Sequence, residues 1–266
     1  MITDYSKYKR FFTFGCSFTG YKYPTWADIM SRNLPNARFH NISQSGGGNT
    51  YIASRLTEAN RVYKFCETDL VMVMWSTYCR EDRWVKDKSW ITPGNIYSQR
   101  EYDFTDNAYL CNWADPTTFI VRDLAIIDIT TSYLNNLPCD TFGMLSVPFT
   151  YQQDFNNNQT LTDFLALYKD LEESYPPSMF VQEMNSTWGY SCEYTSGHDE
   201  ELFRDYHPSP EQYCQYLQKI GVSMTDEALS YTANATAILA QIKEEAQFKI
   251  AFPNIDPRTV GNRELI

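Results

Sequence analysis

Residues 10–19 have the sequence RFFTFGCSFT, in which an apolar run meets a glycine, a cysteine and a serine. The run Arg10–Phe14 predicts a buried strand, and Gly15 permits a tight turn at its end. A second strand is predicted over Phe39–Ile42. A third, Leu70–Trp75, is the continuous run LVMVMW, which is typical of strands buried on both faces of a parallel sheet. Helical patterns alternate with these strands, so we expect a doubly wound, three-layer α/β fold.

The remaining elements are predicted from the spacing of apolar residues and from helix-capping residues. Helices are expected over residues 25–34, 49–63, 119–137, 162–173, 209–219 and 225–245, and a fourth strand over residues 141–147. Residues 176–208 are predicted to be mostly loop. The polar, aromatic stretch over about residues 80–118 is interpreted as an insertion. We therefore expect one domain over residues 1–266, with a C-terminal helical extension over about residues 222–266.

The composition excludes several classes of protein. Of the 266 residues, 43% are hydrophobic, which excludes wholesale disorder, and the net charge of -11 argues against binding nucleic acid as the main function. No stretch reaches the ~20 apolar residues that span a bilayer, and the N-terminus has no pattern of a secretory signal. We expect a cytoplasmic or virion-associated protein without membrane partners. The seven cysteines form no C-x-x-C pair, so neither a metal site nor a disulfide framework is predicted.

A serine follows the first predicted strand. Ser17 would stand at the carboxyl edge of the sheet, which is where open α/β sheets bind ligands. Its backbone N–H could face an oxyanion. Most Gly-x-Ser turns are only turns, and thiol chemistry at the adjacent Cys16 is a weaker alternative because its side chain should point the other way.

The glycine run Gly46-Gly47-Gly48 follows the second predicted strand. Such a run can bring a backbone N–H close to a substrate, or cradle a phosphate at the start of the next helix. No Lys-Ser/Thr pair follows it, so it is not a P-loop. A flexible loop of small residues is the alternative interpretation.

Only three histidines are available as a general base. His40 lies inside a predicted strand, where a structural role is favoured. His198 lies in a polar, acidic loop and stays a rival. His207 precedes a predicted helix in the sequence Asp205-Tyr206-His207-Pro208, and an aspartate two residues away can orient its imidazole.

These segments, taken in order, resemble the SGNH hydrolases, the GDSL-type serine esterases. The first block is similar to Gly15-Cys16-Ser17-Phe18, with Cys16 in place of the usual aspartate, and the last block to Asp205-Tyr206-His207-Pro208. The second block is similar to residues 41–49, where Gly46 matches the oxyanion-hole glycine. The resemblance implies a parallel, flavodoxin-like five-stranded sheet between helices, and within the superfamily it is greatest to phage-type members.

Two departures from the family pattern bear on activity. The third block, Gly-x-Asn-Asp, is replaced by Trp75-Ser76-Thr77-Tyr78, so Thr77, Ser76 or Asn49 would have to supply the missing oxyanion donor. Loss of one such donor typically lowers turnover by ~10²–10³. The spacing from Asp205 to His207 is also one residue shorter than usual.

The resemblance implies a serine esterase without metal or cofactor. Ser17 would be the nucleophile, His207 the base and Asp205 its orienting acid, with the N–H groups of Ser17 and Gly46 facing the oxyanion. The substrate prediction comes from the aromatic residues, which make up 16% of the chain. Since sugars stack on flat aromatic rings, we expect an acyl ester on carbohydrate. The residues assigned to the substrate are Arg80, Trp75 and Trp84.

Other interpretations stay open at this stage. Arg80 could be a surface arginine paired with Glu81 or Asp82, and the aromatic residues could pack the insertion onto the body of the domain. The missing asparagine also suits a protein that keeps the fold without the chemistry. Such a protein would be a binding or structural component, for example in a virion or a homo-oligomeric assembly.

Overall fold

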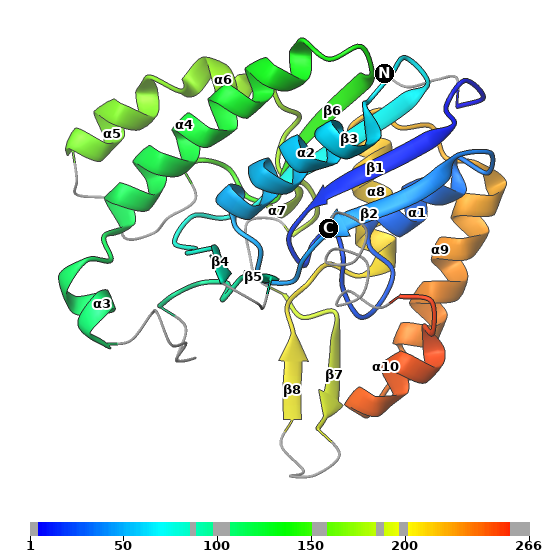
Figure 1. Cartoon of the computed structure of the whole chain (residues 1–266). Helices are drawn as coiled ribbons and strands as arrows, with labels where there is room; N and C mark the ends of the chain where they lie inside the picture. The colour runs from blue at the N-terminus through cyan, green and yellow to red at the C-terminus, as the bar shows by residue number, and fades with distance from the viewer. Residues whose placement is uncertain are drawn as a thin grey trace.

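A parallel four-stranded sheet forms the centre of the molecule (Figure 1). The computed structural model describes residues 5–85, 89–97, 107–150, 159–184, 189–196 and 202–255. The sheet order is β2-β1-β3-β6, with β1 at Arg10–Gly15, β2 at Arg38–Ser43, β3 at Asp69–Trp75 and β6 at Asp140–Leu145. All neighbouring strands pair in parallel. This is the strand order of a flavodoxin-like sheet, whose switch point lies between β1 and β3.

Helices cover both faces of the sheet, which confirms the predicted three-layer α/β/α fold (Figure 1). On β3, Leu70, Met72 and Met74 face one layer, while the alternate residues face the other. The first layer consists of α1 (Trp26–Arg32), α8 (Pro210–Lys219) and α9 (Asp226–Leu239). The second consists of α2 (Asn49–Tyr63) and α4 (Pro116–Asn135). Burial on both sides explains the unbroken apolar sequence of β3.

Two of the predicted helices begin at capping residues. Thr25 caps α1 in a capping box with Asp28, and Ser209 caps α8 in a capping box with Gln212. Pro210 occupies the first turn of α8, where its missing N–H costs nothing.

Several element boundaries were predicted wrongly. Instead of one helix over 162–173 there are two, α5 (Gln159–Ala166) and α6 (Lys169–Glu173). The helix predicted over 225–245 stops at Leu239, and α10 (Glu245–Ala251) is separate. The predicted loop over 176–208 contains α7 (Met179–Glu183) and a hairpin of β7 (Cys192–Thr195) and β8 (Leu202–Asp205).

The expectation of a five-stranded sheet is not confirmed, because the central sheet has four strands in the described part of the chain. The segment before His207 pairs with itself as the antiparallel β7–β8 hairpin, which projects away from the sheet beside α10 (Figure 1). Its backbone hydrogen bonds are therefore used within the hairpin, so it does not extend the parallel sheet.

The described part of the insertion contains a second small hairpin and a short helix. Strands β4 (Arg83–Val85) and β5 (Ser89–Ile91) pair in an antiparallel ladder, and α3 (Asn107–Asn112) precedes α4. None of the helices in the described ranges has the length and apolar character required to cross a bilayer.

Candidate active site

Ser17 lies in a tight turn directly after β1. The N–H groups of Thr19 and Gly20 both donate to the Cys16 carbonyl, at 2.9 and 3.1 Å. Gly15 is required for this path, because an added Cβ would lie 2.0 Å from Thr19 Oγ1. Ser17 is thus placed at the carboxyl edge of the sheet, at its switch point between β1 and β3.

Asp205 and His207 reach the same edge from the other end of the chain. Asp205 is the last residue of β8, and its carbonyl accepts from the Ser191 N–H at 2.7 Å. His207 lies between β8 and α8, and its carbonyl accepts from the Tyr23 hydroxyl at 3.2 Å. The rigid start of α8 and the hairpin therefore fix the imidazole from both sides.

The three predicted residues form one continuous hydrogen-bonded chain. Ser17 Oγ lies 2.7 Å from His207 Nε2, and His207 Nδ1 lies 2.8 Å from Asp205 Oδ1. An ionised carboxylate only accepts hydrogen bonds, which assigns the imidazole proton to Nδ1. Nε2 is then left to accept the Ser17 proton. The shortened Asp-to-His spacing is accommodated because the His207 N–H also donates to Asp205 Oδ1, at 3.1 Å.

Asp205 is buried and surrounded by donors. Its second oxygen, Oδ2, accepts from the Tyr21 hydroxyl at 2.9 Å and lies 3.1 Å from Lys22 Nζ. Burial alone would raise the pKa of the Asp205 carboxyl, but the hydrogen bonds and charges of His207 and Lys22 outweigh it and lower the pKa to about 2. The carboxylate therefore stays ionised at every pH at which the protein is expected to function.

The candidate oxyanion donors are two backbone N–H groups. In the described part of the chain, no group accepts a hydrogen bond from the N–H of Ser17 or of Gly46. Gly46 has a φ of 79°, a conformation that favours glycine. The Cα of Gly46 lies close to the segment that follows β5, because an added Cβ would lie 2.3 Å from the Thr92 carbonyl oxygen. Part of the insertion thus packs on the glycine loop and sets its position.

Comparisons with known proteins give alignments to solved structures. No protein-family model matches the sequence, and no curated protein matches it. The protein YXIM from Bacillus subtilis aligns with a TM-score of 0.43 and 11% identity, over 83% of this chain and 59% of its own. A member of the lipolytic protein G-D-S-L family from Veillonella parvula aligns with a TM-score of 0.37 and 12% identity, over 80% of this chain and 98% of its own.

This chain therefore spans less than two thirds of the YXIM chain. Both TM-scores are below 0.5.

The start of α2 is already occupied by a carboxylate. Asp82 accepts from the N–H of Gly48 at 2.9 Å and from the N–H of Tyr51 at 2.9 Å. These are the donors that a phosphate would need at the helix N-terminus. The phosphate-cradle interpretation of the glycine run is therefore not supported.

The side chain of Asn49 is also committed to the scaffold. Its Nδ2 donates to the Ser76 carbonyl at 3.2 Å and to Asp123 Oδ2 at 3.0 Å, and its Oδ1 accepts from the Ser76 N–H at 2.9 Å. Both amide hydrogens are used, so the expectation that Asn49 donates to an oxyanion is not supported.

This arrangement predicts a purely structural effect of Asn49→Ala. We expect the free energy of unfolding in urea to fall by about 2–4 kcal/mol, because the Ser76 N–H and Asp123 lose buried partners. The folded fraction should keep its rate of p-nitrophenyl acetate hydrolysis. A ~10²-fold slower rate at unchanged stability would instead restore Asn49 as an oxyanion donor.

Arg80 links the two loops that carry the candidate donors. Its Nη1 donates to the Gly47 carbonyl at 2.8 Å, and its Nε donates to Thr77 Oγ1 at 3.1 Å. The Thr77 hydroxyl keeps its hydrogen for another acceptor, so Thr77 stays a predicted third donor. Substrate contact by the rest of the Arg80 guanidinium also stays a prediction. The expected surface pairing of Arg80 is replaced by these two contacts.

The two tryptophans assigned to the substrate lie in different surroundings. Trp75 is 1% exposed in the core, and its Nε1 donates to the Tyr175 hydroxyl at 3.0 Å. The expectation that Trp75 contacts substrate is therefore wrong, because the alternation of β3 turns its ring into the α2–α4 layer. Trp84 is 58% exposed on β4, with its ring 6.0 Å from that of Trp90. Its role as a substrate contact stays a prediction.

Neither Cys16 nor His40 takes part in the hydrogen-bonded chain that contains Ser17. Cys16 is 1% exposed and packs in the α1–α8 layer, as its predicted orientation away from Ser17 requires. His40 is buried in β2 and stacks on Phe12, with ring centroids 4.7 Å apart. His198 lies outside the described residues.

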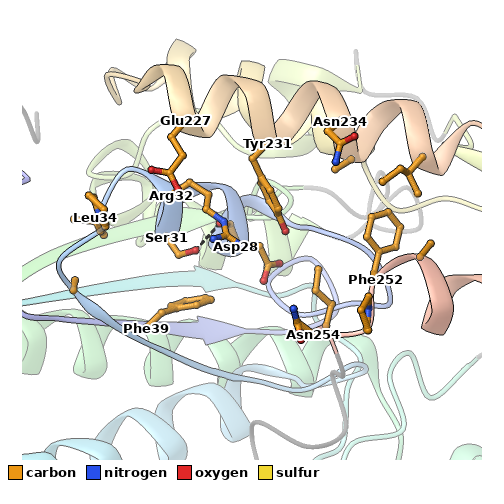
Figure 2. Close-up of a pocket in the computed structure, with 17 residues that line it drawn as sticks. Asp28, Ser31, Arg32, Leu34, Phe39, Glu227, Tyr231, Asn234, Phe252 and Asn254 are labelled. Atoms are coloured by element: carbon orange, nitrogen blue, oxygen red, sulfur yellow. Dashed lines mark hydrogen bonds between the residues drawn. The ribbon is translucent and has the colours of Figure 1, made fainter.

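A cavity of about 540 Å³ lies apart from this site, between α1, α9 and the segment after α10 (Figure 2). Two of its charged groups, Arg32 and Asp28, have partners within the protein. The Arg32 guanidinium lies 4.5 Å from the centre of the Tyr231 ring, and Asp28 accepts from the Thr25 N–H at 2.9 Å. None of Ser17, Asp205 and His207 lines this cavity.

Sequence reasoning missed the residues that surround Asp205. Tyr21 and Lys22 belong to TGYKYP, a stretch with no motif. The sequence feature that points to Tyr21 and Lys22 is their position, four and five residues after Ser17 in the same loop.

Proposed function

We propose that this protein is a serine ester hydrolase in which Ser17, His207 and Asp205 act together. The observation that supports this best is the hydrogen-bonded chain from Ser17 Oγ through His207 to Asp205, with links of 2.7 and 2.8 Å. These distances are within the hydrogen-bond reach that proton transfer requires. Ser17 is 188 positions from Asp205 and 190 positions from His207 in the sequence, so only folding brings it into contact with them.

The proposed reaction transfers an acyl group from an ester to water. Ser17 Oγ attacks the ester carbonyl carbon while its proton moves to His207 Nε2. The ester C–O bond then breaks, and His207 returns that proton to the leaving alcohol oxygen. In the second half, a water gives its proton to His207 and attacks the acyl-serine, which releases the acid and the Ser17 hydroxyl.

The negative charge of each tetrahedral intermediate requires donors. The N–H groups of Ser17 and Gly46 would supply two, and the Thr77 hydroxyl would supply the third in place of the missing asparagine. The buried carboxylate of Asp205 stabilises the imidazolium that forms at the same moment.

The proposed substrate class is an acetyl or other small acyl ester on carbohydrate. Large aromatic side chains are exposed on the insertion and on the hairpin, among them Trp84 at 58%, Trp113 at 76% and Tyr206 at 46%. Tyr206 directly precedes His207, so an aromatic ring lies in the segment that carries the base. Sugar rings stack on such flat apolar faces while their hydroxyls remain hydrated.

Labelling with a fluorophosphonate probe tests the proposal. The wild-type protein should gain one probe, located on Ser17 by peptide mass analysis, since only a serine activated by a base attacks phosphorus rapidly. Ser17→Ala should abolish the label and the release of acetate from p-nitrophenyl acetate and acetylated xylan.

Cys16→Ala is the matched control, because Cys16 is the neighbouring residue and packs in the core. It should keep the label. A wild-type protein that stays unlabelled would contradict the proposal and favour the alternative, a binding or structural protein that retains only the fold. Labelling with hydrolysis of p-nitrophenyl acetate but not of acetylated xylan would contradict the carbohydrate assignment alone.

A further inference from the structure

Asp205 is held through both of its carboxylate oxygens, and only one of them faces His207. Oδ1 accepts from the two N–H groups of His207, at 2.8 and 3.1 Å. Oδ2 faces Tyr21 and Lys22 at 2.9 and 3.1 Å. Neither of these two residues belongs to the three that are proposed to react.

Lys22 is enclosed by aromatic rings that hold its ammonium in place. Nζ donates to the Tyr194 hydroxyl at 2.6 Å and lies 3.9 Å from the centre of the Tyr194 ring and 4.4 Å from that of Phe248. The side chain is 19% exposed and that of Asp205 is 1% exposed, so little water screens this pair. The aromatic rings therefore hold the ammonium in one position, whereas a solvated surface lysine moves freely.

Tyr21 completes the enclosure of the imidazole. Its ring stacks on His207 with centroids 3.8 Å apart and planes 23° apart. Burial, with the charge of Asp205 beside it, raises the pKa of Tyr21, so its hydroxyl remains a donor to Oδ2. The ring therefore fixes the plane of the imidazole, and the hydroxyl fixes the carboxylate that orients it.

We propose that Lys22, supported by Tyr21, is the positioning residue of this site, which holds Asp205 by its far oxygen and offsets part of its charge at His207. This inference rests on the proposed function. A full negative charge on Asp205 favours the imidazolium, which cannot accept the Ser17 proton. The Lys22 cation opposes that effect, because it lies 3.1 Å from Oδ2 and offsets part of the carboxylate charge.

Other titratable groups face Asp205 from each surrounding element. They are Tyr21 and Tyr23 from the loop after β1, Cys192 from β7, His207, and Tyr213 from α8. Tyr194 of β7 contacts Lys22, and Lys243 lies near Cys192. Burial raises the pKa of Tyr23, Tyr213 and Cys192, the last to about 11. Since Asp205 has a pKa lowered to about 2, its carboxylate stays ionised throughout a pH profile between pH 4 and 8.

The test removes the charge of Lys22 in two ways. Lys22→Met and Lys22→Gln should both raise the midpoint of the acid limb of kcat/KM for p-nitrophenyl acetate, by roughly 0.5–1 pH unit. Both should also lower kcat/KM at the pH optimum by roughly 10- to 100-fold, mainly through kcat, because the imidazole is less well oriented. Lys22→Arg should restore the wild-type midpoint. Lys22→Gln decides the question if the methionine variant does not fold.

Lys219→Met is the matched control, because Lys219 also pairs with a buried carboxylate, Glu183, at 3.0 Å, away from this site. It should leave the midpoint unchanged. If the Lys22 variants lose kcat/KM equally at all pH values, with an unchanged midpoint, Lys22 only supports packing and the inference is overturned.

A second readout separates this inference from the proposed function. The titration of the His207 C2 proton by NMR needs no activity, and three histidines allow its assignment from a His207→Gln variant. If the wild type proves to be inactive, the proposed function fails, but a rise of this NMR midpoint in Lys22→Met would still support the charge effect. An unchanged NMR midpoint overturns it in either case.

Discussion

Replacing Asp205 with asparagine should lower kcat for p-nitrophenyl acetate by roughly 10³–10⁴-fold, with little change in KM. The reason is the hydrogen-bond inventory around the carboxylate. Four donor contacts from Tyr21, Lys22 and His207 surround its two oxygens. An amide keeps one acceptor oxygen and replaces the other with an NH₂ donor. Either the donors of His207 or those of Tyr21 and Lys22 therefore lose their acceptor.

Both orientations of the asparagine are unfavourable. With its NH₂ toward His207, Nδ1 must accept, which moves the imidazole proton to Nε2 and removes the base from Ser17. With its NH₂ toward Lys22, a donor meets an ammonium that cannot accept. The fluorophosphonate labelling rate measures the same loss without turnover.

Glu183→Gln is the control for this variant, because Glu183 is another buried carboxylate paired with a lysine. It should reduce stability without reducing the labelling rate. Labelling of Asp205→Asn within tenfold of the wild type would contradict the assigned role of Asp205.

Gly46→Ala should produce the second large effect, a loss of roughly 10²–10³-fold in kcat. Gly46 has a φ of 79°, and an alanine Cβ would lie 2.3 Å from the Thr92 carbonyl oxygen. The loop cannot accept this contact without moving, and its movement displaces the N–H that we assign to the oxyanion. The melting temperature should fall as well, because the insertion packs on this loop.

Gly94→Ala separates backbone strain from displacement. Gly94 has a similar φ of 83°, but its added Cβ would meet only the Gly46 Cα, at 3.7 Å. It should cost about 1–2 kcal/mol of stability from the left-handed conformation, with a much smaller loss of kcat. Equal losses of kcat in the two variants would contradict the assignment of the Gly46 N–H as a donor.

The location of the proposed site follows from the order of the strands. β1 has β2 on one side and β3 on the other. The loops that follow β1 and β3 therefore lead away from each other at the switch point. Ser17, the glycine run and the Thr77 segment leave the sheet at this edge. The α8 layer then brings His207 back to the same place, which explains why distant segments form one site.

Elements whose residues interact locally could be predicted from the amino-acid order alone. The apolar runs of β1 and β3, the capping boxes at Thr25 and Ser209 and the position of Pro210 are set by neighbours within a few residues, so periodicity and capping predict them. The order of Ser17, Asp205 and His207 along the chain could also be recognised, since the motifs that contain them are short and contiguous.

The partners of the buried polar groups depend on how distant segments pack in three dimensions. Lys22 meets Asp205 across a separation of 183 positions in the sequence, and Asn49 meets Asp123 across 74. The segment before His207 forms the antiparallel β7–β8 hairpin where a loop was predicted, and the pleat of β3 turns Trp75 into the core. Hydrogen bonds and ion pairs between distant segments depend on packing that no local pattern records, because each partner is chosen by the fold and not by its neighbours in the chain.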